Sequence, residues 1–227
     1  MVFSCVTYDF NATPVDVLEV WSCASSCDQQ ASWSGVTGLL DGDDVTADAT
    51  IAPDGRVSVA VNLGKQASAD LSYRVGYFTC AGNCGVPGSW SSAVLDQVGL
   101  YGRRLAIDAD ETGRLALAIN GTVSGTNGLF LSTCAGDCSQ KQNWTTTLAD
   151  DAKRLNATMP ENPPSGCTNA TWIADRVNGV AFKAGKVVTT SGYGAIGTGG
   201  SCFNNLFSPT TAYTYIRSVV SFALGSL

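Results

Sequence analysis

The chain has 227 residues, of which 44% are hydrophobic and only 14% are charged, with 25 glycines. This composition favours short strands and tight turns over helices or disorder, so we expect an all-β protein. The net charge of -6, with 13 scattered lysines and arginines, argues against a nucleic-acid partner, which would need a basic face. No apolar run approaches the roughly 18 residues of a membrane span, so none is expected.

Nine cysteines occur in a chain without histidine. Structural zinc sites commonly mix cysteine with histidine or bring two cysteine pairs together, whereas oxidised cysteines suit an extracellular compartment. Sequons for N-glycosylation agree with a secreted or extracellular protein, which would carry glycans in a host with the machinery. They begin at Asn11, Asn120, Asn143, Asn156 and Asn169.

In chain order, the first distinctive segment is CASSCDQQASW at 23–33, which returns as CAGNCGVPGSW at 80–90 and CAGDCSQKQNW at 134–144. Each copy has two cysteines four positions apart and a tryptophan six positions after the second. A period of about 50 residues is typical of solenoids and propellers, in which one supersecondary unit is repeated. If each turn folds back, it can close a disulfide. The predicted pairs are Cys23 with Cys27, Cys80 with Cys84, and Cys134 with Cys138.

Each copy of this signature lies between two predicted strands. LEVWSC, VGYFTC and LFLSTC lead into the cysteine pairs, and WSGVTGL, WSSAVLD and WTTTLAD begin at the tryptophans. Segments 57–61 and 115–119 alternate large apolar with small residues, which is the pattern of a strand with one buried face. The turns at 53–55 and 110–113 contain Asp and Gly and predict hairpins. Four short antiparallel strands per repeat predict a propeller blade.

The last section repeats this pattern less regularly. Segment 185–192 (GKVVTTSG) matches the register of the earlier strands but comes late, so the proline-rich stretch 153–175 is interpreted as an inserted loop. Cys167 and Cys202 flank this hairpin and are the best remaining disulfide pair. Cys5 is then left over, and it is either buried in a strand or bonded to another chain.

The two ends of the chain predict a closed ring. Segment 2–10 resembles a second strand and segment 216–224 a first strand, so we expect the N- and C-terminal strands to share one blade and remove the exposed sheet edges. The same pattern would also fit part of a larger ring. The predicted single domain, 1–227, has four blades, approximately 2–38 plus 216–224, 39–96, 97–150 and 151–215.

The repeated signature resembles the Asp-box or BNR repeat of sialidase-like propellers, in which a turn between the third and fourth strands ends in a tryptophan. Here that turn carries C-x-x-x-C instead. The resemblance implies a β-propeller, a fold that hosts hydrolases, lectins and assembly modules alike. Sialidases use an arginine cluster, a Tyr–Glu nucleophile and an Asp acid. This chain offers Arg103, Arg104 and Glu111 near one blade, without an arginine motif ahead of the repeats.

The absence of histidine excludes a Ser-His-Asp triad, and a glycosidase-type carboxylate pair is the remaining catalytic option. Acidic turns at 41–44 and 108–113 have ligands that suit Ca²⁺, but hairpin chemistry also explains them, so no metal or cofactor is expected. The signature tryptophans are expected to pack, and Trp21 and Trp172, outside the pattern, are better candidates for a surface contact.

We therefore predict a secreted, disulfide-stapled β-propeller that acts without catalysis as a binding or assembly module. Its expected partner is a protein or glycan on an extracellular surface, and self-assembly is a further option because Cys5 is spare. The alternative is a carbohydrate-active propeller, either a lectin or a sialidase-like glycoside hydrolase. A residue with a catalytic role is not predicted.

Overall fold

The computed structural model describes residues 2–5, 16–17, 19–23, 25–36, 41–42, 46–63, 73–99, 105–123, 126–151, 168–183, 186–198 and 212–223. Antiparallel strands dominate this part of the chain, which confirms the all-β prediction. Its helical elements are three short 3-10 turns, η1 (Gln30–Ser32), η2 (Pro87–Ser89) and η3 (Lys141–Asn143). Within the ranges described, no helix has the length and apolar character to cross a membrane.

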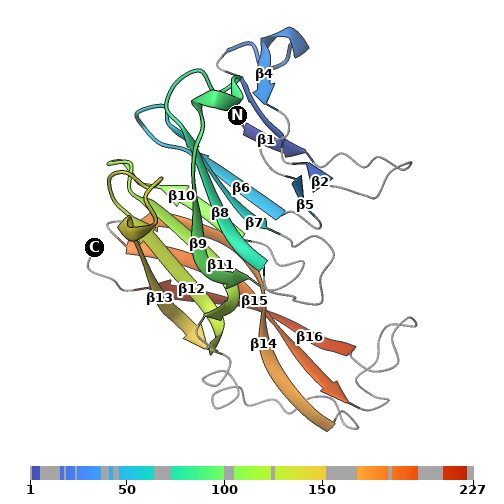
Figure 1. The fold of residues 1–227 in the computed structure, drawn as a ribbon. Coiled ribbons are helices and arrows are strands. Elements are labelled where there is room, and N and C mark those ends of the chain that lie inside the picture. The colour runs from blue at the N-terminus through green and yellow to red at the C-terminus, as the bar shows by residue number, and fades with distance from the viewer. Residues whose placement is uncertain are drawn as a thin grey trace.

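Two meanders of four antiparallel strands form the centre of the molecule (Figure 1). The sheets are numbered in chain order, so these are called the second and third meanders. The second meander consists of β6 (Thr46–Ile51), β7 (Val57–Leu63), β8 (Tyr73–Cys80) and β9 (Ser91–Gly99). The third meander consists of β10 (Leu105–Ala109), β11 (Leu115–Val123), β12 (Thr126–Cys134) and β13 (Trp144–Asp151). The ends of β9 and β11 also pair, so the two meanders are joined at one corner.

A smaller sheet lies on either side of the meanders. The first sheet contains β1 (Val2–Cys5), β3 (Glu19–Cys23) and β4 (Trp33–Val36), and a short pair joins β2 (Asp16–Val17) to β5 (Asp41–Gly42). The fourth sheet contains β14 (Thr168–Lys183), β15 (Lys186–Thr198) and β16 (Ala212–Ala223). Figure 1 shows β1 and β4 at the top and the labels of β14 and β16 at the bottom.

The predicted pairing of the two chain ends is wrong in the described strands. β16 pairs with β15, from Val187 opposite Ala223 to Gly197 opposite Ala212, whereas β1 pairs with β3. The 13-residue strand β15 offers β16 a much longer edge than the four residues of β1, so more backbone groups are hydrogen-bonded. Residues 216–224 therefore extend the fourth sheet and do not complete the blade predicted at 2–38.

Two predicted boundaries also shift. β14 begins at Thr168, inside the stretch 153–175 for which the prolines predict an inserted loop. The prolines of that stretch all precede Thr168, and the residues that follow include two threonines, one tryptophan and one isoleucine, which favour strands. The boundary predicted at 96 falls inside β9, which continues to Gly99.

Neighbouring sheets pack face to face through three apolar cores. The alternation along β11 divides its residues between two of them: Leu115, Leu117 and Ile119 join the core shared with the second meander. Ala116 and Ala118 join the core shared with the fourth sheet. Val57, Val59 and Val61 of β7 pack with Val20 of the first sheet. Each meander is therefore buried on both faces, and the side chains packed between neighbouring sheets set the distance between those sheets.

Candidate functional sites between the sheets

The three C-x-x-x-C turns share one construction. Disulfides join Cys23 to Cys27, Cys80 to Cys84 and Cys134 to Cys138, with Cα–Cα distances of 5.7, 5.6 and 5.9 Å. After each turn, one 3-10 turn leads to the signature tryptophan, whose indole N–H donates to the carbonyl of the second cysteine. The distances are 3.0 Å for Trp33, 3.1 Å for Trp90 and 2.8 Å for Trp144. The tryptophan thus fastens the disulfide turn to the start of the next strand.

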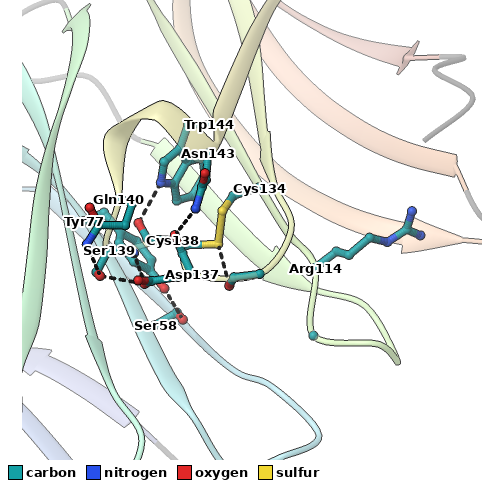
Figure 2. Close-up of a disulfide and its surroundings, with 12 residues drawn as sticks. Ser58, Tyr77, Arg114, Cys134, Asp137, Cys138, Ser139, Gln140, Asn143 and Trp144 are labelled. Atoms are coloured by element: carbon teal, nitrogen blue, oxygen red, sulfur yellow. Dashed lines mark hydrogen bonds between the residues drawn. A yellow bond between two sulfur atoms is a disulfide. The ribbon is translucent and has the colours of Figure 1, made fainter.

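The third turn also contacts the neighbouring meander (Figure 2). The rings of Tyr77 and Trp144 meet edge to face, with centroids 5.1 Å apart. The Tyr77 hydroxyl lies 2.9 Å from the Ser58 hydroxyl in a buried hydrogen bond. Burial raises the pKa of Tyr77, and the hydrogen bonds from Ser58 and Thr79 offset only part of this effect. The phenol is therefore neutral and structural.

Asp137, the acidic residue of this turn, takes part in several local hydrogen bonds. The Asp137 carboxylate accepts from the Ser139 hydroxyl at 2.6 Å and from its backbone N–H at 3.1 Å, and these bonds lower the pKa of Asp137. The Asn143 side-chain amide donates to the Asp137 carbonyl at 2.8 Å. These contacts order the turn internally.

Two aspartates connect successive sheets in a chain of contacts that the sequence analysis missed. Asp48 on β6 accepts the backbone N–H of Ile107 on β10 at 2.9 Å. Asp108 on β10 accepts the backbone N–H of Phe182 on β14 at 3.1 Å. The available signal was a carboxylate with an apolar neighbour on each side within a strand, because such a group needs a donor when it is partly buried.

A cavity of about 430 Å³ lies where β6, β10 and β14 come together. Small side chains and backbone form most of its wall, and Asp48 supplies its one carboxylate among the described residues. The lining residues are Thr46, Ala47, Asp48, Leu105, Ala106, Val177, Gly179 and Val180. Asp48 accepts the Ile107 N–H through one carboxylate oxygen, and among the described lining residues no second titratable side chain stands beside it.

A second cavity, of about 320 Å³, lies between the β10–β11 turn and the β14–β15 hairpin. It differs from the first in its charged wall, which is made by Asp108, Ala109, Asp110, Glu111, Thr112, Arg114, Phe182 and Lys183. Partial burial raises the pKa of Asp110, but bonds from Thr112 and Arg114 outweigh this and lower it overall. The carboxylate receives the Arg114 Nε–H at 2.6 Å, so it is held as an anion.

Asn120 does not fit its prediction as a glycosylation site. Its side chain is fully buried on β11, and a glycan attached there is incompatible with this packing. Neither of its amide atoms has a hydrogen-bond partner in the described part of the chain. Asn143 is exposed on η3, so glycosylation there stays a prediction.

The remaining predicted residues are placed only in part. Trp21 is half-buried, with its ring against Gly35, so it packs within the first sheet. The side chains of Cys5 on β1 and of Asn169 and Trp172 on β14 lie outside the described set. The other residues outside the description are Asn11, Asn156, Cys167, Cys202, Arg103 and Arg104. Within the described ranges, no three Cys, Asp or Glu side chains are grouped to hold a metal ion.

Comparison with known proteins gives no family, since no family model and no curated protein matches the chain.

Proposed function

We propose that the chain is a secreted, disulfide-stapled β-propeller that acts as a non-catalytic binding or assembly module on an extracellular structure. The observation that carries this proposal is that three aspartates on the described strands and turns are engaged in structural hydrogen bonds or an ion pair. Asp48 and Asp108 hold backbone N–H groups of neighbouring sheets, and Asp110 is paired with Arg114. Groups committed to such bonds support a rigid scaffold better than they support proton transfer, which needs a free acid or base.

The propeller part of the proposal rests on the stacking of the sheets. Sheets that follow one another in the chain share apolar cores, and β10 lies against both β6 and β14 around the larger cavity. A ring of twisted sheets that meet along their first strands has this arrangement. The tryptophan that closes each turn between third and fourth strands is the feature shared with Asp-box propellers. On this proposal the four sheets are four blades.

The secreted location is supported by the disulfides, which persist in oxidising compartments. Three staples on three successive turns also suit a protein that must remain folded outside the cell. The proposed partner is a protein or glycan of an extracellular surface.

A carbohydrate-active protein is the second candidate, favoured by the charged cavity beside Phe182. Retaining and inverting glycosidases both need one carboxyl that is protonated before it acts as the acid. The lowered pKa of Asp110 makes that residue a poor acid, so the cavity supports lectin-like binding better than hydrolysis.

The test combines a glycan array with a hydrolysis assay on the oxidised, purified chain. We expect binding to an extracellular glycan or protein without turnover. Turnover of a glycoside that is abolished by replacing one Asp or Glu would overturn the non-catalytic proposal. Intact mass under non-reducing conditions would count the disulfides and detect a covalent dimer. A Cys5→Ser variant that changes a covalent dimer to a monomer would support assembly through that residue.

A further inference from the structure

Two equivalent hairpins, β6–β7 and β10–β11, each carry an arginine at the same position, but the two arginines make different contacts. Arg56 and Arg114 each follow a turn glycine with positive φ, +84° at Gly55 and +82° at Gly113. Arg56 crosses to the next meander, where its Nη2 donates to the Gly113 carbonyl at 3.3 Å. It therefore spans the junction between the second and third meanders.

Among the described residues, Arg114 makes no corresponding bond to the fourth sheet. Its Nε–H donates to Asp110 at 2.6 Å within its own turn, and its guanidinium lies 5.9 Å from the centre of the Phe182 ring. The facing hairpin is shorter, because Lys183 pairs directly with Lys186 across residues 184–185. The longer turn at 110–114 therefore stands opposite a short one, and the charged cavity lies between them.

Among the described residues that line this cavity, one anionic and one cationic side chain are free. Glu111 and Lys183 are exposed, and neither makes a hydrogen bond or ion pair with another described residue. Arg114 and Asp110 add a fixed donor and acceptor, and Phe182 adds an apolar surface. A strongly charged ligand would meet a like charge on one side of the cavity. A neutral ligand with many hydroxyls would find both acceptors and donors.

We propose that the junction between the β10–β11 turn and the β14–β15 hairpin binds a neutral sugar residue of a glycan. In this role Glu111 accepts a hydrogen bond from one sugar hydroxyl, Lys183 donates to another, and the C–H face of the ring packs on the Phe182 and Arg114 side. The inference rests on the proposed binding function and names its ligand class. The volume of about 320 Å³ is suited to a single sugar unit.

The experiment measures affinity for neutral oligosaccharides that end in hexose, deoxyhexose or N-acetylhexosamine, by array and then by calorimetry. We expect Glu111→Ala and Lys183→Ala each to weaken binding about tenfold, because each removes a charge-assisted hydrogen bond. Lys186→Ala is the matched control, since it removes an exposed lysine from the same hairpin outside the cavity wall. Its expected effect is less than about twofold. The exposed positions should leave the melting temperature unchanged.

Three results would overturn the proposal. One is wild-type binding to no neutral glycan. The second is glycan binding that Glu111→Ala and Lys183→Ala leave intact, which would leave the broader binding function standing. The third is equal loss in Lys186→Ala, because that would reflect overall charge and not this cavity. Turnover of the bound glycan would instead contradict the non-catalytic function itself.

Discussion

The two faces of β11 bury different kinds of side chain. Towards the second meander the strand presents Leu115, Leu117 and Ile119, which interlock with the large residues of β8 and β9. Towards the fourth sheet it presents Ala116 and Ala118, which leave room for residues of β12, β14 and β15. β11 thus forms a junction filled by large side chains with the second meander, called the thick junction, and a junction of small side chains with the fourth sheet, called the close junction. We expect a smaller side chain to destabilise the thick junction and a larger side chain to destabilise the close one.

The largest effect is expected for Leu117→Ala, which empties the thick junction at a fully buried position. Removing a buried leucine side chain typically costs about 2–5 kcal/mol, through lost burial and the cavity left behind. Urea denaturation should show the loss as a lower midpoint with a similar slope. Leu148→Ala is the control, because that leucine is 44% exposed on β13. Equal losses in the two variants would refute the assignment of Leu117 to the core.

The close junction should instead be sensitive to enlargement. Ala118→Leu places three extra carbons opposite Leu131 and against the fourth sheet, and overpacking of this kind costs about 1–3 kcal/mol. The reverse logic predicts that Leu117→Ile, which conserves volume in the thick junction, costs less. Denaturation of the two variants side by side checks this order. If Ala118→Leu were neutral, the fourth sheet could not lie against that face.

The disulfides of the second and third meanders differ in how far their second cysteines are exposed. Cys134 and Cys138 are both buried in the thick junction, whereas Cys84 is half-exposed. We expect a limiting dithiol to reduce Cys80–Cys84 before Cys134–Cys138, because the thiolate must reach a sulfur atom. Timed alkylation and peptide mass would give the order. Replacing both Cys134 and Cys138 by alanine should cost about 2 kcal/mol from loop entropy. Simultaneous reduction of the two turns would contradict the difference in access.

Local patterns predicted the strands well, because alternation and turn residues act over a few positions. The alternating segments became β7 and β11, and the strand starts at Trp33 and Trp144 agree with β4 and β13. Pairing between distant strands was harder. The apolar pattern of 216–224 predicts a strand but not which sheet edge that strand joins. In the structure it pairs with the long edge of β15.

The site shows the same limit. A sequon is read from three residues, yet Asn120 continues the row of Ala116 and Ala118 and is therefore buried with them. The alternation shows that Asn120 shares a face with Ala116 and Ala118, but it predicts only one buried face, so the packing of this second face against the fourth sheet was not visible in it. The contacts of Asp48 and Asp108 could not be predicted either, because each depends on a strand from another sheet.

The smallest expected effect concerns Tyr77, which contacts the third turn from the second meander. Tyr77→Phe keeps the ring but leaves the Ser58 hydroxyl without this partner, which should cost about 1 kcal/mol near neutral pH. The pKa of Tyr77 is raised from its ordinary 10.0 on folding, so the folded protein holds the phenolic proton more tightly than the unfolded chain. The resulting stability is complete below the ordinary pKa and is lost as pH rises through the raised one. The advantage of wild type over Tyr77→Phe should therefore be constant from pH 7 to about 9 and shrink above about 10. Denaturation of both proteins across that range isolates this residue, because the other tyrosines and lysines titrate in both. A constant difference at all pH values would mean that the buried phenol and the turn it supports do not form the junction described here.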